Sequence, residues 1–180
     1  MMSRMRPILA CAVLAVVALA MAGCGGEDDQ TAPTRAQFIT TADKLCTSSN
    51  RRTRSLNLQL RRASAGAGGE RELLRRLAPI LERGAGGVGE NAAAFRATRP
   101  PAGDEVEIDL IRGLYDRQAQ LARQLAAAAK AGDVAQFKAL STQQTDVVGR
   151  ARRLSRAYGF RECGSTKSDP VRRAPARRDA

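Results

Sequence analysis

The cysteines of this chain are its clearest candidates for chemistry, because a thiolate can attack a carbon centre, bind a metal or form a disulfide. The 180 residues contain four cysteines and no histidine. Cys24 directly follows Met21, Ala22 and Gly23, at the end of a long apolar run. Small side chains at this spacing suit the cleft of a signal peptidase, and the Cys24 thiol is the nucleophile that takes up a diacylglycerol group before cleavage.

The segment before Cys24 has the organisation of a secretory signal. Arg4 and Arg6 form a positive head, and no charge interrupts the apolar run that follows. Together with the thiol, this segment resembles the signals of bacterial lipoproteins, which usually have leucine where this chain has Met21. We expect residues 1–23 to be a signal peptide and Cys24 to be the lipidation site, with palmitate-like chains that hold the protein on the extracytoplasmic face of the cell membrane.

An uncleaved membrane helix and ordinary secretion are the alternatives. The apolar stretch from Ile8 to Gly23 falls short of the roughly 20 residues that span a bilayer. A multiply acylated cysteine is a firm anchor, since each buried methylene contributes about 0.8 kcal/mol. Lipid anchoring is therefore the favoured interpretation.

Two cysteines remain once Cys24 is lipidated and Cys11 is removed with the signal. Cys46 and Cys163 form an even pair in an oxidising compartment, which predicts a disulfide. The pair is separated by 117 positions, and the chain-entropy model gives roughly 4 to 5 kcal/mol for closing such a loop. We expect no metal site, because two thiols without histidine do not complete a zinc shell.

Catalytic chemistry is poorly supported by the remaining residues. Without histidine the chain lacks the commonest general base and every Ser-His-Asp or Cys-His arrangement. The one carboxylate cluster comprises Asp104, Glu105, Glu107 and Asp109. These residues precede or open a predicted helix, where the helix dipole stabilises acids, so a capping role is favoured over catalysis. We expect no enzymatic activity, no catalytic residue and no cofactor.

Several polar residues fall on or beside the predicted inner faces of helices. They are Ser49, Asn50, Gln118, Gln144 and Thr145. Such residues can line a small-ligand pocket within a helical bundle. The more common role is to form hydrogen bonds with neighbouring groups in the core, and the sequence favours this second interpretation.

The charge of the chain predicts attraction to anionic surfaces. Lys and Arg number 30 against 18 acids. Removal of the signal leaves 28 basic residues and a net charge of +10, which favours anionic lipids or wall polymers as partners. Nucleic acid is disfavoured because no aromatic platform accompanies the basic residues. The abundance of Arg, Ala and Gly also matches a GC-rich genome, which would give the charge no function.

The elements that position these residues are predicted to be four amphipathic helices. Apolar residues recur at helical spacing over 34–63, 70–98, 104–131 and 133–158. Thr34 with Gln37, Asp104 with Glu107 and Asp133 with Gln136 have the spacing of N-terminal caps. Gly159 followed by Phe160 has the pattern of a Schellman end.

The second of these helices contains residues that weaken helices. Pro79 removes a backbone hydrogen bond and predicts a kink or a restart. Gly84, Gly86, Gly87 and Gly89 predict local fraying. Close approach of another helix and a hinge are the two alternatives for these glycines.

Short connections between such helices predict an all-α fold, an antiparallel up-down four-helix bundle with one disulfide. The predicted organisation is a signal peptide over 1–23, a flexible tether over 24–33, the bundle over 34–164 and a basic disordered tail over 165–180. In this topology the end of the fourth helix lies beside the start of the first, which would let Cys163 reach Cys46.

Five short motifs in this order carry a family resemblance. They are Ala42-Asp43-x-x-Cys46, Asn50-Arg51, Pro100-Pro101, Ala131-Gly132-Asp133 and Tyr158-Gly159-Phe160-x-x-Cys163-Gly164. The region from 34 to 164 resembles a group of uncharacterised lipoproteins of high-GC Gram-positive bacteria. The resemblance implies an extracytoplasmic helical domain and supplies no activity. The sequence thus predicts a lipid-anchored interaction module, with a small-ligand binding protein as the alternative.

Overall fold

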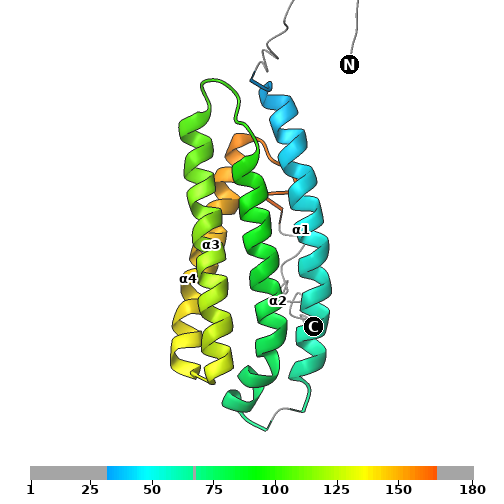
Figure 1. The fold of residues 1–180 in the computed structure, drawn as a ribbon, viewed down its shortest axis with the longest axis vertical. Helices are drawn as coiled ribbons and strands as arrows, with labels where there is room; N and C mark the ends of the chain where they lie inside the picture. Colours follow the sequence, from blue (N-terminus) through cyan, green and yellow to red (C-terminus); the bar gives the residue numbers. More distant parts are fainter. Residues whose placement is uncertain (1–31, 67, 166–180) are drawn as a thin grey trace, which may run out of the picture. The chain divides into compact units, whose positions relative to one another are not determined.

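The computed structural model describes residues 32–66 and 68–165, and it confirms the predicted fold class (Figure 1). The four helices are α1 (Arg35–Ser64), α2 (Glu70–Ala97), α3 (Glu105–Ala131) and α4 (Val134–Tyr158). They run antiparallel in an up-down bundle, and the described residues contain no strand. The predicted signal peptide, Cys24, nearly all of the tether and nearly all of the tail lie outside the described residues. Within the described part, no helix is both long and apolar enough to cross a bilayer.

Three of the predicted helix ends are confirmed. Thr34 and Gln37 form a reciprocal capping box at the start of α1. The Asp133 carboxylate accepts a hydrogen bond from the backbone N–H of Gln136 at 2.9 Å. Gly159 has φ +112°, a conformation that favours glycine, and the next residue, Phe160, donates its N–H to the Ser155 carbonyl at 2.9 Å. Local sequence therefore sets these boundaries.

The predicted cap at Asp104 is wrong. Its side chain accepts no hydrogen bond from the first turn of α3. Asp104 Oδ2 instead accepts a hydrogen bond from the Tyr158 hydroxyl at 2.6 Å. A tertiary hydrogen bond from the end of α4 has replaced the local one, because Asp104 faces the neighbouring helix.

The weak points predicted in α2 do not interrupt it. The helix is continuous from Glu70 to Ala97, so it neither restarts at Pro79 nor frays at the glycines. A Cβ placed on Gly87 would lie 3.0 Å from Arg52 Cδ, and one on Gly84 would lie 3.5 Å from Leu56 Cδ1. At Gly84 and Gly87, side chains of α1 lie close to α2, as the alternative prediction of a closely approaching helix requires.

The helices do not enclose the interior equally on all sides. α1 packs on α2, α2 on α3 and α3 on α4. No Cα atom of α1 lies within 8 Å of a Cα atom of α4. The backbones of α1 and α4 therefore stay apart, and side chains such as Phe38 and Tyr158 connect these two helices at one end.

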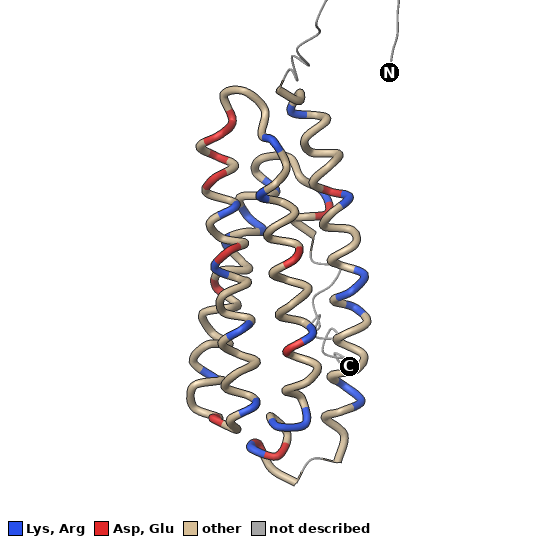
Figure 2. The backbone as a smooth tube through the Cα atoms, in the orientation of Figure 1, with Lys and Arg blue, Asp and Glu red and all other residues tan. Residues whose placement is uncertain are grey.

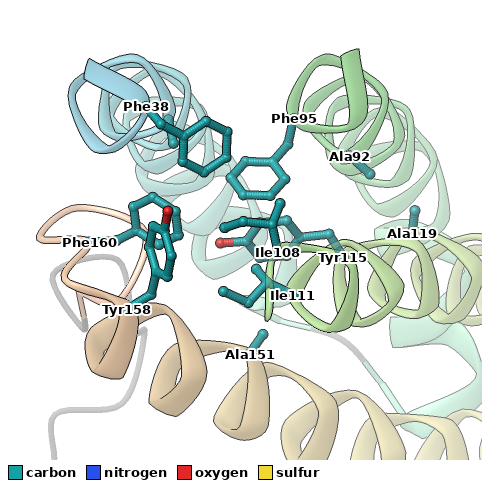
Figure 3. Close-up of a cluster of buried hydrophobic side chains, with 11 residues drawn as sticks. Phe38, Ala92, Phe95, Ile108, Ile111, Tyr115, Ala119, Ala151, Tyr158 and Phe160 are labelled. Carbon is teal, nitrogen blue, oxygen red and sulfur yellow. The ribbon is translucent and has the colours of Figure 1, made fainter. Parts of the chain in front are cut away.

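An aromatic cluster fills the end of the bundle where α1 begins and α4 ends (Figure 3). It contains all the aromatic residues of the described chain except Phe137. The rings of Phe38 and Phe95 lie 6.0 Å apart, and those of Phe95 and Tyr115 lie 4.9 Å apart. Phe160 packs against Phe38, Phe95 and Tyr158. Edge-to-face packing of this kind adds to the stability gained from burial alone.

The opposite end is packed by leucine and alanine in two smaller clusters. One is built on Leu74, Ala78 and Ala129, and the other on Leu121, Ala128 and Leu140. α1 contributes no member to either cluster. Its fully buried residues are Phe38, Ala42 and Cys46, all in its first half.

Candidate functional site

The turn that follows α4 crosses to α1 and is held there by Asp43. The two carboxylate oxygens of Asp43 accept hydrogen bonds from the backbone N–H groups of Arg161, Glu162 and Cys163, at 3.0, 2.9 and 3.2 Å. Hydrogen bonds to a charged acceptor are among the stronger ones in proteins. Asp43 thus orders the segment that carries the second cysteine.

One face of α1 carries the disulfide and two side chains that bind this turn. Cys46 forms the predicted disulfide with Cys163, with a Cα–Cα distance of 5.0 Å. One turn further on, the Asn50 amide donates to the Glu162 carbonyl at 3.1 Å. Asp43, Cys46 and Asn50 share a helix face because they are three and four residues apart. The two motifs at opposite ends of the chain, Asp43-x-x-Cys46 and the segment ending in Cys163, therefore meet in space.

A groove begins beside the disulfide and runs between α1 and α4. Its first section has a volume of about 210 Å³. The polar lining comes from all four helices and includes Ser49, Asn91, Gln118, Gln144 and Arg152. Such a section is smaller than the usual 300 to 1,000 Å³ of a drug-sized pocket.

The groove continues as a second, apolar section of about 190 Å³. The two sections share Ser49, Thr53, Val88 and Gln144 in their linings. The second section is formed mainly by the side chains Leu56, Leu60, Ile80, Leu81 and Leu125. The groove as a whole is polar at the disulfide end and apolar toward the end of α1.

The structure brings together four of the five polar residues singled out in the sequence. Ser49, Asn50, Gln118 and Gln144 all line the first section of the groove. Thr145 does not belong to it; its side chain is exposed, and its hydroxyl donates to the Ser141 carbonyl at 2.9 Å. Ser49, Gln118 and Gln144 form no side-chain hydrogen bond within the described chain, so the prediction that such residues bond to core neighbours holds only for Asn50.

Sequence reasoning missed other groove residues. Asn91 lies between Val88 and Ala92 on the inner side of α2, and its spacing to Phe95 could have revealed it. Arg152 is half-buried and lines the groove. Its neighbours Arg150, Arg153 and Arg156 on the same helix are exposed.

Two buried hydroxyl groups lie beneath the disulfide. The Tyr115 hydroxyl is 3.2 Å from Ser155 Oγ and 4.0 Å from Cys46 Sγ. Burial raises the pKa of Tyr115, because the phenolate would lose its hydration there. The phenol therefore stays protonated and acts as a hydrogen-bonding group of the core.

The predicted carboxylate cluster takes a structural role. Asp104 accepts from Tyr158, whose pKa is raised above its usual value by burial and then by that hydrogen bond. The Arg35 guanidinium lies 4.2 Å from the centre of the Tyr158 ring and pairs with Asp104 and Glu107 at 3.7 Å each. Glu105 and Asp109 are exposed. These contacts join the ends of α1, α3 and α4.

The groove offers groups that can hold a ligand. Its lining includes carboxamide and hydroxyl groups, the guanidinium groups of Arg152 and Arg52, and an apolar continuation. Within the described residues, no group of three acids or cysteines is placed to hold a metal ion. No protein-family model, curated protein or solved structure matches this chain.

Proposed function

We propose that this protein is a non-enzymatic, lipid-anchored module on the extracytoplasmic face of the cell membrane, of the lipoprotein group that its motifs resemble. The observation that carries the proposal is the Cys46–Cys163 disulfide, which joins α1 to the segment that follows α4. Disulfides of this structural kind are rare in a reducing cytosol. Such a bond is what an exported chain with a lipidated Cys24 would need.

The distribution of charge supports a role in contacts with anionic lipids or wall polymers. Figure 2 shows basic residues along the helices and acidic residues gathered on the first turns of α3. Exposed arginines that make no ion pair with described residues include Arg51 and Arg54 on α1 and Arg150 and Arg153 on α4. The sequence after residue 165 adds one lysine and four arginines to the basic residues of the chain.

Membrane fractionation of the native protein and a Cys24→Ala variant tests the anchor. We expect the native protein to remain in the membrane fraction at high salt and the variant to be released, because only the acyl chains resist screening. Retention of the variant at high salt would contradict lipid anchoring. Mass spectrometry that found Met1 in place and no acyl mass would contradict export altogether.

The groove supports a second candidate function, that of an extracytoplasmic binding protein for a small ligand. Four polar side chains that form no side-chain hydrogen bond with another described residue line the groove, namely Ser49, Asn91, Gln118 and Gln144. Polar groups placed in a concave, otherwise apolar site commonly orient a ligand. A bundle that served only as a spacer would not require them.

Native mass spectrometry tests this second function. Protein released from its own membranes under mild conditions should carry a non-covalent adduct that a Gln118→Leu, Gln144→Leu variant lacks. A Gln124→Leu variant is the matched control, since Gln124 is exposed on the same helix as Gln118. An adduct that persists in the groove variant would show that ligand binding occurs elsewhere.

A further inference from the structure

The α1/α4 groove changes character along its length, and this gradient limits what it can bind. The section beside the disulfide presents hydroxyl and carboxamide groups, whereas the next section presents mainly aliphatic side chains. The two sections are contiguous through Thr53 and Val88. A ligand that fills both must carry a polar group at one end and a hydrocarbon chain at the other.

The charges of the lining favour an anionic polar group. Among the described residues, no Asp or Glu lines either section. Arg152 lies at the polar section, and Arg52 lies at the apolar one, where its side chain crosses Gly87 and pairs with Glu90. A cationic head group would therefore find no carboxylate in the lining with which to pair.

The amides of the polar section can serve as donors to such a head group. Gln144 lines this section with its amide group, whose Oε1 is buried without a partner among the described residues. Asn91 and Gln118 contribute two further amides, and Ser49 contributes a hydroxyl. Hydrogen bonds from several donors to one carboxylate are typical of anion recognition.

The apolar section is formed by the half of α1 that has no fully buried residue. Leu56 and Leu60 are only half-buried, and they face Ile80 and Leu81 across the groove. Gly84 and Gly87 on α2 also line this section, and the side chains of Leu56 and Arg52 pack over them. A hydrocarbon chain lying here would cover leucine surface that the bundle leaves partly exposed.

We propose that the α1/α4 groove binds a single-chain anionic amphiphile, with the acid group among Ser49, Asn91, Gln118 and Gln144 and the hydrocarbon chain along Leu56 and Leu60. This inference rests on the second candidate function and names its ligand class. It is independent of whether Cys24 is lipidated.

The test uses the mature chain from residue 24 with Cys24→Ala, so that the protein carries no acyl chain of its own. Calorimetric titration with octanoate, decanoate and dodecanoate below their micelle concentrations measures the contribution of chain length. Each added methylene should tighten binding by roughly fourfold until the apolar section is full. A flat series would overturn the proposal.

Head-group selectivity is tested with monolaurin, which is neutral, and dodecyltrimethylammonium, which is cationic. Dodecanoate should bind roughly tenfold more tightly than monolaurin, the difference expected from one charge-assisted contact. The cation should not compete with dodecanoate. Equal binding of the cation would overturn the assignment of the acid group.

Two matched variants test whether dodecanoate binds in the groove. Ala122 lines the apolar section, so Ala122→Phe should abolish dodecanoate binding. Ala127 lies exposed on the same helix, and Ala127→Phe should bind as the parent does. Circular dichroism confirms that both variants are folded, and dodecanoate binding that survives Ala122→Phe would overturn the site.

A butanoate titration separates this inference from the function on which it rests. One informative result is that butanoate binds the parent as tightly as dodecanoate does and fails to bind the Gln118→Leu variant. This result would support a small-ligand site and overturn the proposal of an amphiphilic ligand. If none of the acids binds, the proposal of an amphiphilic ligand is overturned as well. Native mass spectrometry of the protein from its own membranes then tests the small-ligand function by itself.

Discussion

The two halves of α1 belong to differently built regions of the bundle. The aromatic half of the molecule contains Phe38, Phe95, Tyr115, Tyr158 and Phe160 together with the Cys46–Cys163 disulfide. The leucine half contains the groove side chains Leu56, Leu60, Ile80, Leu81 and Leu125 with the two small clusters. α1 is anchored by buried side chains, a disulfide and Asp43 in the first region, and by none of these in the second.

The burial pattern of α1 indicates that one helix can contribute most of its packing energy at one end. Long helices gain most of their stability from packing rather than from intrinsic propensity. The buried residues of α1 are all in its first half, so we expect its second half to contribute less to stability. The following predictions test whether the two halves differ in stability as described.

Removing the disulfide should have the largest effect. A Cys46→Ala, Cys163→Ala variant frees a loop of 117 residues, and the chain-entropy model gives about 4 to 5 kcal/mol of lost unfolding free energy. Urea denaturation of the oxidised parent and the variant measures the loss. Coincident denaturation curves would contradict a stabilising disulfide.

Truncation of a side chain should cost more unfolding free energy in the aromatic half than in the leucine half. Phe95 is fully buried against three other rings, so Phe95→Ala should cost about 3 to 5 kcal/mol. Leu60 is half-buried beside the groove, and Leu60→Ala should cost about 1 kcal/mol. Similar losses in urea denaturation would remove the distinction between the halves.

Alkaline pH should destabilise the aromatic half through its two tyrosines. The pKa values of Tyr115 and Tyr158 are raised in the folded protein. The unfolded chain therefore releases these protons first, and stability falls with rising pH above about 10, by at most about 1.4 kcal/mol per pH unit for each tyrosine.

Denaturation midpoints measured between pH 8 and 11 test whether stability falls as the pH rises. A Tyr158→Phe variant should show a shallower decline than the parent, since it removes one of the two groups. An unchanged slope in that variant would show that Tyr158 does not carry the effect.

The smallest effects should come from the glycines of α2. Gly86 is exposed, with open space around it, so Gly86→Ala should stabilise the helix by about 0.5 to 1 kcal/mol. Gly87→Ala would place a Cβ 3.0 Å from Arg52 Cδ and should gain less. Equal gains in thermal denaturation would show that α1 does not approach α2 at Gly87.

Sequence alone determined the features that depend on neighbours along the chain. The caps at Thr34 and Asp133 and the Schellman end at Gly159 were predictable because each involves residues within a few positions. Helical periodicity gave the fold class, and the compartment suggested by Cys24 led to the Cys46–Cys163 pairing.

Only the tertiary structure decided how the helices face one another. The sequence predicted that Asp104 caps its own helix, yet its carboxylate accepts a hydrogen bond from the hydroxyl of Tyr158 on another helix. The role of Asp43 required the turn after α4 to arrive beside α1, over a separation of more than a hundred residues. The groove exists because α1 and α4 stay apart, and no residue pattern within either helix encodes that spacing, since it depends on how side chains from all four helices fill the interior.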